Sequence, residues 1–434
     1  MAATDATPQS LRPASAPDAS APDVSADALS GDGADALAAP ASGSGSETSA
    51  ATAPPFAKGD IGHQASEVAD ETTGPDAPAP LAMVPTETVT VTYSFKTYAA
   101  GRFTADDCGL GKDDLIAMYR GMLLQRRFEE RAAQMYGKQK ISGFLHLYIG
   151  QEAISTGTAQ ALNVGHDSVI TAYRDHGLGL ALGMTAREGM AEMFGKSTGS
   201  SKGKGGSMHF FKAERGFYGG HGIVGGHVPV GVGLAFSHKY LGDGGVSVSF
   251  LGDGAVGQGA VHEALNLASL YELPAIVVIE NNQYAMGTAT HRAFGQPEFT
   301  RLGVGYDIES WIVDGMDVLA VTKAMQDAVA IARENRPLLI EMRTYRYRGH
   351  SMSDPQKYRT KEEMDARKAD DPIVRLKAVL VDMGHASVED LDAIDEQVKA
   401  EVTDAAEFAE TSPEPTLESA YDDVYTQKNY PFIC

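Results

Sequence analysis

The sequence predicts an α/β fold in which a mainly parallel sheet is flanked by helices on both faces. Short apolar runs rich in β-branched residues alternate with stretches of helical periodicity, which is typical of parallel strands buried between helices. The expected strands cover residues 168–171, 246–251, 275–280 and 338–345. The chain has 434 residues, 43% of them hydrophobic. It is therefore long enough to bury one large core or two ordinary ones.

Helical patterns lie before, between and after these strands. Residues 113–137 carry apolar side chains at three- and four-residue spacing, which predicts a packed amphipathic helix. Its expected core residues are Leu115, Met118, Tyr119, Met122 and Leu123. Between the second and third strands, a further helix is expected to bury Val261, Ala264, Leu265 and Ala268. Residues 371–410 have the pattern of acidic amphipathic helices and show no residues that indicate chemistry.

The first 84 residues consist mostly of Ala, Pro, Ser, Thr, Gly and Asp. Because such a composition cannot bury a core, we expect a disordered tail over residues 1–84 and a folded domain with a helical C-terminal part over residues 85–434. Two roles stay open for the tail, an inert solubilising extension and a docking arm for a larger assembly. It has neither the apolar segment of a secretory signal nor the arginine-rich composition of a transit peptide, so a cytoplasmic, bacterial location is expected.

Composition excludes several classes of partner. The formal net charge of -22 argues against nucleic acid, because binding phosphates needs clustered cations. No run approaches the roughly 18 apolar residues that would span a bilayer, so no membrane partner is expected. Cys108 and Cys434 are the only cysteines. They are too few for a disulfide framework or a cysteine metal site, and this fits a reducing compartment.

The strongest chemical signal is a βαβ unit between residues 246 and 284. Its first strand ends in Gly252-Asp253-Gly254-Ala255, and its second strand is followed by a run that contains Asn282 and Tyr284. In a right-handed crossover both strand ends open onto one crevice, so Asp253 and Asn282 should converge. The glycines let a ligand approach the backbone, and the next helix points free N–H groups at an anion. A carboxylate, an amide oxygen and a carbonyl near Tyr284 suit Mg²⁺ bound to a diphosphate.

A rival interpretation uses the same glycines. Gly252-x-Gly254-x-x-Gly257 also fits the dinucleotide-binding pattern, and Glu280 lies near where a ribose-binding acid is expected. Asp253 counts against this interpretation, because its carboxylate would sit among phosphates with no cation to neutralise it. We favour the metal–diphosphate site and keep the dinucleotide site as the alternative.

Several motifs in a fixed order carry a resemblance to a known family. The segment from Asp253 to Tyr284 resembles the thiamine diphosphate motif, which opens with Gly-Asp-Gly and closes with paired asparagines. Further matching segments are residues 143–148, 171–177, 202–209, 222–225 and 345–355. Together they resemble the α subunits of the first component of pyruvate dehydrogenase, which are thiamine diphosphate-dependent 2-oxo acid dehydrogenases, over roughly residues 88–425. The resemblance implies a thiamine diphosphate-binding fold.

The resemblance also implies a role for each matching residue. Mg²⁺ would be held by Asp253, Asn282 and the Tyr284 carbonyl. The residues expected to bind the cofactor are Tyr173, Arg174, Gly222, Val224, Asp253, Gly254, Ala255, Asn282 and His350. His146 and His350 would face the reacting centre, where an imidazole can donate to a substrate carboxylate or move protons. His176, His209, His221 and His227 are expected to be structural.

The implied reaction is oxidative decarboxylation of pyruvate with thiamine diphosphate and Mg²⁺. The acetyl group would pass to a lipoyl domain of dihydrolipoamide acetyltransferase, the second component of the complex. A β subunit would supply the glutamate that activates the cofactor, within a two-α, two-β tetramer. The nearest alternatives are the α subunits of branched-chain 2-oxo acid and acetoin dehydrogenases. A non-catalytic scaffold with the same fold is a further alternative, against which Asp253, Asn282, His146 and His350 argue.

In the family, the loop at residues 348–354 orders over the cofactor and can carry regulatory phosphoserines, and Ser351 matches one such position. The stretch after Pro355 is one residue shorter than in animal enzymes and lacks a serine, which argues against regulation by a kinase. The segment 202–207 is not a nucleotide-binding loop, because Lys204 is followed by glycine where Ser or Thr is required. We expect it to shape the active-site channel, with Lys202 and Lys204 at the rim.

Overall fold

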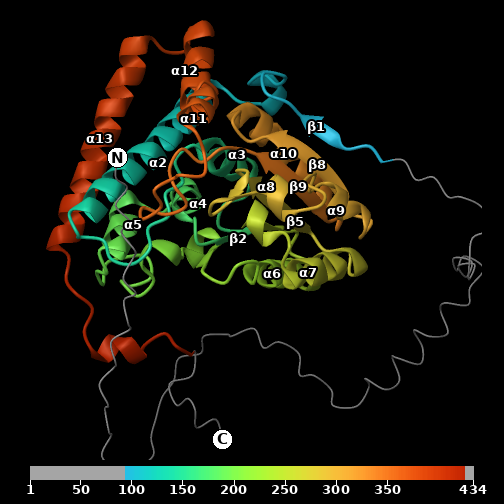
Figure 1. Ribbon diagram of the computed structural model, residues 1–434, viewed down its shortest axis with the longest axis horizontal. Helices are drawn as coiled ribbons and strands as arrows, with labels where there is room; N and C mark the ends of the chain where they lie inside the picture. Colours follow the sequence, from blue (N-terminus) through green and yellow to red (C-terminus); the bar gives the residue numbers. More distant parts are fainter. Residues whose placement is uncertain (1–92, 426–434) are drawn as a thin grey trace, which may run out of the picture. The chain divides into compact units, whose positions relative to one another are not determined.

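A parallel sheet of seven strands forms the centre of the protein (Figure 1), whose computed structural model describes residues 93–425. The predicted tail over residues 1–84 lies outside the described residues. In spatial order the strands are β1 (Lys96–Tyr98), β8 (Glu309–Asp314), β9 (Leu338–Arg343), β5 (Ala275–Asn281), β4 (Ser247–Gly252), β2 (Ser168–Ala172) and β3 (Phe217–His221). Every neighbouring pair runs parallel. A separate antiparallel hairpin joins β6 (Tyr284–Ala285) to β7 (Thr288–Ala289).

The sheet separates two hydrophobic cores. Along β4, Val248 and Phe250 belong to one core, whereas Leu251 belongs to the other. In β5, Ile276 and Val278 face the first core, whereas Ala275, Val277 and Ile279 face the second. Successive side chains of a strand point to opposite faces, so near-continuous apolar strands need helices on both sides. The predicted fold class is confirmed.

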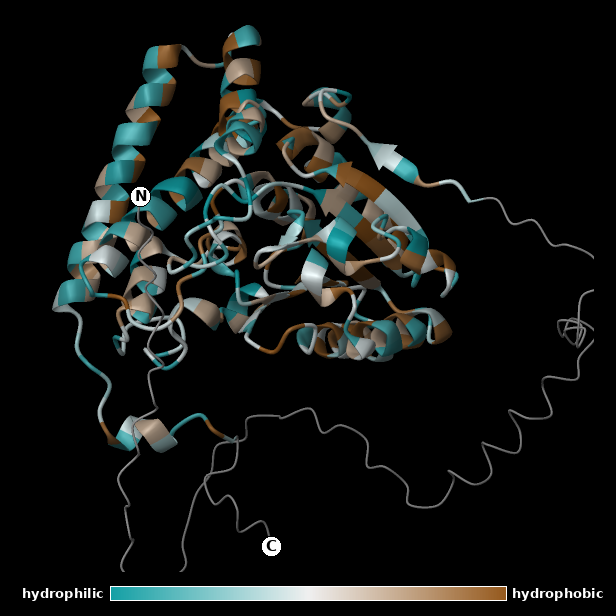
Figure 2. Ribbon diagram, in the orientation of Figure 1, coloured by the Kyte–Doolittle hydropathy of each residue, from teal (hydrophilic) through white to brown (hydrophobic). Residues whose placement is uncertain are grey.

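Different helices cover the two faces (Figures 1 and 2). The helices of the first core are α2 (Lys112–Gly137), α3 (Glu152–Ala161), α4 (His176–Ala181), α5 (Ala186–Met193), α10 (Val318–Ala332), α12 (Pro372–Asp382) and α13 (Val388–Thr411). The second core is covered by α6 (His227–Leu241) and α7 (Gly259–Leu270), beside the short α8 (Thr290–Ala293) and α9 (Arg301–Val304). The helix α11 (Lys361–Lys368) precedes α12 and buries no residue. Among the described residues, no helix is both long and apolar enough to cross a membrane.

The predicted elements agree closely with the structure in the centre of the fold. The strands expected at 168–171, 246–251 and 275–280 are β2, β4 and β5, within one residue at each end. The helix expected at 113–137 is α2, and its five predicted core residues are buried. The last predicted strand, 338–345, is too long, because β9 ends at Arg343. Beyond it the chain leaves the sheet, and the Tyr347 N–H donates to the Ile149 carbonyl at 3.0 Å. The acidic region at 371–410 contains α12 and α13, as expected.

Candidate active site

Five neighbouring strands end at the same edge of the sheet, and the residue runs that follow them line one cavity of about 820 Å³. In a parallel sheet all carboxyl ends lie together, so segments far apart in sequence meet there. Every predicted site residue lines this cavity: His146, Tyr173, Arg174, Gly222, Val224, Asp253, Gly254, Ala255, Asn282, Tyr284 and His350. The cavity size suits a cofactor-sized ligand.

Asp253 begins the 3-10 turn η4 (Asp253–Ala255) directly after β4, and only 2% of its surface is exposed. Its Oδ2 has no hydrogen-bond partner within the chain. Burial raises the pKa of this carboxyl to about 6, because desolvation disfavours the charged form. A buried carboxylate oxygen without a partner is unfavourable unless a cation or a donor joins it. The Asp253 side chain therefore fits a metal ligand.

Asn282 and Tyr284 supply two more oxygens beside Asp253. The Asn282 side chain is held in place by Gln151, because its Nδ2 donates to Gln151 Oε1 at 3.0 Å. Its Oδ1 and the Tyr284 carbonyl both accept from Nη1 of Arg346, at 3.3 and 3.2 Å. The set is one carboxylate, one amide oxygen and one carbonyl, which are hard oxygen donors of the kind that Mg²⁺ prefers. The residues present thus fit a magnesium ion.

Arg346 was not predicted as a site residue. It is 1% exposed, and its Nη2 donates to the Met286 carbonyl at 3.3 Å and to the Tyr358 hydroxyl at 3.0 Å. The Tyr358 hydroxyl donates to Asp354 Oδ2 at 2.6 Å, and the same oxygen accepts from the His350 backbone N–H at 2.6 Å. Arg346 therefore connects the predicted metal ligands to the loop that carries His350.

The two predicted catalytic histidines lie together with Tyr173. The centroid of the His146 ring lies 4.6 Å from the ring centroid of Tyr173 and 5.0 Å from that of His350. Burial, and then the positive charge of Arg174, lowers the pKa of His146 to about 2 and that of His350 to about 4. Both imidazoles are therefore neutral near pH 7. The Nδ1 atom of His146 is buried without a hydrogen-bond partner in the chain, so a bound group can reach an unused donor or acceptor there.

Arg174 has a contact pattern that was not predicted. Its Nη1 donates to the Leu147 carbonyl at 2.5 Å, and its Nη2 donates to the His350 carbonyl at 2.8 Å. Burial lowers its pKa to about 10, so the guanidinium stays charged at neutral pH. Arg174 thus holds together the two backbone segments that carry His146 and His350, in addition to lining the cavity.

Glu280, the acid of the rival dinucleotide interpretation, is already paired. It is buried, and its Oε1 accepts a hydrogen bond from the hydroxyl of the buried Tyr148. Burial raises the pKa of Glu280 to about 7. The helix α7 begins at Gly259, so Gly252, Gly254 and Gly257 all precede it, and η4 stands between the strand and the helix. This local structure differs from a glycine turn that opens directly into a helix.

The expectation for the glycine-rich segment 202–207 was wrong. None of its residues lines the cavity, although the adjacent Met208 does. Lys202 and Lys204 instead pair with Asp423, at 2.7 and 3.3 Å. The buried Glu192 carboxylate holds the segment from inside, because it accepts from the backbone N–H groups of Ser201, Gly203, Gly205 and Gly206 at 2.7 to 3.0 Å.

The four histidines expected to be structural do not line the cavity. His176 is fully buried between the Glu129 carboxylate, 2.9 Å from its Nδ1, and Ser207. Burial opposes its protonation, but the charge and hydrogen bond of Glu129, the charge of Asp175 and the contact with Ser207 together outweigh burial and raise the pKa of His176. His209, His221 and His227 each contact a backbone carbonyl.

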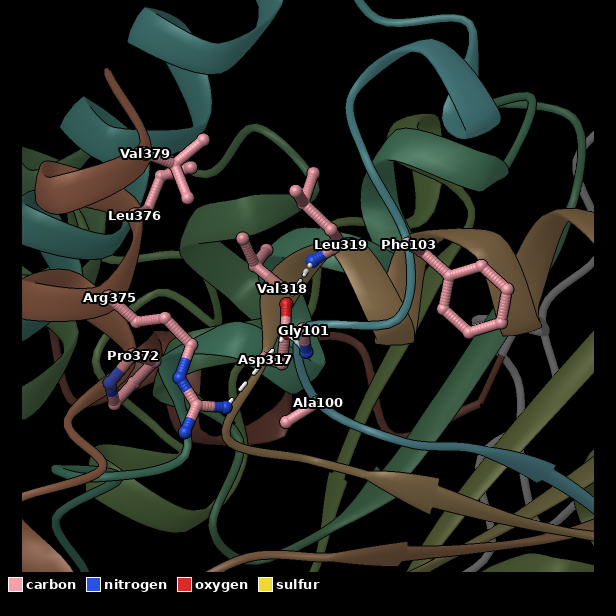
Figure 3. A pocket seen from close by; sticks show the side chains of 10 residues that line it. All are labelled: Ala100, Gly101, Phe103, Asp317, Val318, Leu319, Pro372, Arg375, Leu376 and Val379. Carbon is pink, nitrogen blue, oxygen red and sulfur yellow. Dashed lines mark hydrogen bonds and ion pairs between the residues drawn. The ribbon is translucent and has the colours of Figure 1, made fainter. Parts of the chain in front are cut away.

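A second, smaller cavity of about 310 Å³ lies between the segment after β1, the start of α10 and α12 (Figure 3). Its walls are mainly apolar. Asp317 lines it but caps α10 by accepting from the Leu319 and Ala320 N–H groups, and it also accepts from Gly101 N–H. Arg375 lines it as well and pairs with Asp370 at 3.2 Å. Asp317 and Arg375 therefore make structural contacts between the surrounding segments. We assign the catalytic chemistry to the larger cavity.

Comparison with known proteins agrees with this geometry. The dehydrogenase E1 component family matches residues 120–418, and the chain belongs to this family of thiamine diphosphate-dependent enzymes. Among similar proteins are those named pyruvate dehydrogenase E1 component subunit alpha. The one from Rhizobium meliloti is 52% identical over 315 residues, which cover 72% of this chain and 90% of that protein. The Zymomonas mobilis protein is 49% identical over 330 residues, covering 76% and 92%. The mitochondrial protein of Pisum sativum is 45% identical over 334 residues, covering 75% and 83%.

Proposed function

We propose that this chain is the α subunit of a pyruvate dehydrogenase first component, which decarboxylates pyruvate oxidatively with thiamine diphosphate and Mg²⁺. The observation that carries the proposal is the buried Asp253 carboxylate with an unpartnered oxygen, next to Asn282 and the Tyr284 carbonyl. The relatives that cover most of the chain are named for this enzyme. When bound, thiamine diphosphate supplies the electron sink for loss of carbon dioxide.

The chain's own residues would bind and orient the reactants. Asp253, Asn282 and the Tyr284 carbonyl would hold Mg²⁺, while Gly254 and Ala255 leave room for the diphosphate beside it. The Tyr173 hydroxyl would donate a hydrogen bond to that anion and the charged Arg174 would neutralise part of its charge, since a guanidinium makes paired, charge-assisted hydrogen bonds. Gly222 and Val224 would meet the aminopyrimidine through backbone groups.

His146 and His350 would act on the substrate side of the cavity. Because both are neutral near pH 7, each can donate from one ring nitrogen and accept at the other. An imidazole in this state can hold a substrate carboxylate or take up and return a proton during acyl transfer. Both roles use side-chain atoms that already face the cavity.

The described residues of the cavity leave no free carboxyl group to activate the cofactor, so we infer that a second chain supplies one. Among the described residues that line it, three carry carboxyl groups: Asp253, Glu280 and Asp354. Asp253 is assigned to the metal, Glu280 accepts from Tyr148, and Asp354 accepts from Tyr358 and His350. None is left to activate the cofactor. The activating glutamate would come from a β subunit in a two-α, two-β tetramer, and the acetyl group would pass to a lipoyl domain of dihydrolipoamide acetyltransferase.

The direct test is cofactor binding by the assembled enzyme. The substitution Asp253→Asn is nearly isosteric, and it would remove the only charged protein ligand of the proposed metal site. We expect magnesium-dependent thiamine diphosphate affinity, measured by calorimetry, to fall at least tenfold. Asp423→Asn, at an exposed carboxylate that pairs with lysines, is the control and should bind normally. Unchanged affinity in Asp253→Asn, or preferential binding of NAD by the wild type, would refute the proposed site. Comparing turnover of pyruvate, a branched-chain 2-oxo acid and acetoin then tests the substrate.

A further inference from the structure

The carboxylate of Glu363, on α11, joins two tyrosines from different parts of the chain. It accepts from the Tyr284 hydroxyl at 3.0 and 3.2 Å to its two oxygens, and from the Tyr345 hydroxyl at 2.8 Å. Hydrogen bonds to an ionised carboxylate are stronger than those between neutral groups. Among the described residues, those that line the active-site cavity include Tyr284 but not Glu363. Glu363 is therefore connected to the cavity through Tyr284.

Glu363 makes these contacts instead of the local one that its position in the helix offers. The helix α11 has Thr360 as its N-cap and Glu363 three residues later, which is the sequence pattern of a capping box. In α5 the same pattern forms the box, because the Glu188 carboxylate accepts from the Thr185 N–H at 2.9 Å. In α11 the Thr360 hydroxyl oxygen accepts from the Glu363 N–H at 3.2 Å, while the carboxylate turns to the two tyrosines. Contacts with distant segments thus take the place of a local bond at the start of α11.

The backbone around Tyr284 depends on contacts with other segments. Gln283 has a φ of 71° and Met286 a φ of 52°, in the left-handed region that residues other than glycine rarely adopt. The hairpin that contains Tyr284 pairs only two residues on each strand. Such a short hairpin is not stable by itself. The direction of the Tyr284 carbonyl is therefore set by the groups that hold this residue in place.

Glu363 also helps to hold the arginine that contacts this carbonyl. Arg346 Nη1 donates to the Tyr284 carbonyl at 3.2 Å, and Arg346 directly follows Tyr345 in the chain. The contacts form a closed ring that runs from Glu363 to Tyr284, on to Arg346, back to Tyr345 and again to Glu363. One carboxylate thus fastens both the residue that presents the carbonyl and the segment that carries its donor.

We propose that Glu363 is a positioning residue that fixes the Tyr284 carbonyl for Mg²⁺. The inference rests on the proposed function, in which this carbonyl is a metal ligand. Because Mg²⁺ demands nearly ideal octahedral geometry, a small displacement of one ligand weakens its binding. Glu363 acts on the ion only through the backbone that it holds, as a group behind the ligands that orients them.

The test compares two variants of this contact with matched controls. Tyr284→Phe removes the hydroxyl and keeps the ring and the carbonyl, and Glu363→Gln removes the charge. Tyr98→Phe is the control for the first, because the Tyr98 hydroxyl also donates to a carboxylate, that of Asp327 at 2.7 Å, but Tyr98 does not line the cavity. Glu362→Gln, at the exposed neighbour, is the control for the second. Each chain is assembled with the β subunit, and binding of thiamine diphosphate is measured by equilibrium dialysis over a range of Mg²⁺ concentrations.

We expect Tyr284→Phe and Glu363→Gln to need about tenfold more Mg²⁺ for half-maximal binding, because hydrogen bonds to charged groups contribute more than neutral ones. Both controls should match the wild type. Combining the two changes should add little, since both remove the same contact. Excess Mg²⁺ should restore turnover of pyruvate, which a general loss of structure would not allow. Circular dichroism reports folding.

The outcomes separate this inference from the proposed function. A wild-type Mg²⁺ dependence in both Tyr284→Phe and Glu363→Gln would overturn the inference and leave the function standing. An equally large shift in Tyr98→Phe would overturn it as well, because the effect would then not be specific to the metal site. If the wild-type enzyme itself bound no thiamine diphosphate in the presence of Mg²⁺, the function and the inference would both be refuted.

Discussion

Single buried carboxylates fix the backbone of whole loops in this fold, and Glu192 is the clearest case. Its two oxygens accept four backbone N–H groups from the segment 201–206. Glu192→Gln replaces one acceptor oxygen by an amide that can only donate, so two of these N–H groups lose their partner. We expect the free energy of unfolding to fall by about 2–4 kcal/mol, at about 1–2 kcal/mol for each buried donor left unpaired. Urea denaturation measures the loss. Glu188→Gln, at a half-buried carboxylate of α5, should change stability much less, and an equal loss in both would contradict the explanation.

Tyr358 allows a test of the connection between the metal ligands and His350. Tyr358→Phe removes only the hydroxyl that lies between Arg346 and Asp354. Because the hydroxyl makes two part-buried hydrogen bonds, each of which contributes roughly 0.5–1.5 kcal/mol, we expect the loop around His350 to open more often and turnover to fall about tenfold. Binding of Mg²⁺ itself should change less, since the Arg346 contacts to Asn282 and Tyr284 remain. Trypsin cleavage at Arg348 reports the loop. Unchanged cleavage and turnover would show that the connection has no functional role.

The sequence alone predicts the position of some site residues but not the contacts of others. The convergence of Asp253 and Asn282 follows from chain topology, since each stands at the end of a neighbouring parallel strand. Arg346 and Glu192 could not be predicted in this way. Their roles depend on which loops fold over them, and a single arginine or glutamate in a sequence carries no signal of its backbone partners.

At the level of elements, the start of α6 depends on a buried histidine. His227 is 1% exposed, and its Nε2 donates to the Phe250 carbonyl of β4 at 2.6 Å. Burial lowers its pKa to about 4 from an ordinary value of 6.5. The unfolded chain therefore takes up the proton first as the pH falls, so stability is lost between pH 6.5 and about 4. At about 1.36 kcal/mol for each pKa unit, the loss from this residue approaches about 3 kcal/mol.

A variant isolates this contribution from other titrating groups. His227→Gln keeps a side-chain donor and removes the titration. The free energy of unfolding of this variant, measured by urea denaturation at several pH values, should decline less steeply than that of the wild type between pH 6.5 and 4. Parallel curves for the two proteins would mean that His227 is not held neutral in the folded state.

Elements with strong local patterns were predictable, and those fixed by tertiary contacts were not. The strands β4 and β5 are continuous apolar runs buried on both faces, which is why their limits were nearly correct. The strand β3 contains Gly219 and Gly220, which have little strand propensity, and a Cβ at Gly220 would lie 1.9 Å from Asp175 Oδ2. Its backbone must approach a buried carboxylate closely, and this requirement is visible only in the folded chain.

For the whole molecule, the carboxyl groups that line the cavity support the proposal that this enzyme works with a second chain. The resemblance over residues 88–425 predicted the fold and the family, and the match over residues 120–418 confirms them. The role of the tail over residues 1–84 stays a prediction. Quaternary structure leaves only indirect traces in one sequence, because the apolar residues that stay exposed are recognised only once the helices are placed.

The absence of a free carboxyl group among the described cavity residues predicts that the isolated chain has little activity. With Asp253, Glu280 and Asp354 all engaged, no carboxyl group among the described cavity residues can activate the cofactor. The purified chain, saturated with thiamine diphosphate, Mg²⁺ and pyruvate, should release carbon dioxide at less than a hundredth of the rate of the assembled enzyme, because loss of one catalytic acid–base group alone removes about 10²–10⁴-fold in rate. Carbon dioxide release with an artificial electron acceptor measures this. Adding the β subunit to the same preparation is the control and should restore turnover, whereas substantial activity of the chain alone would mean that one of its own three carboxyl groups activates the cofactor.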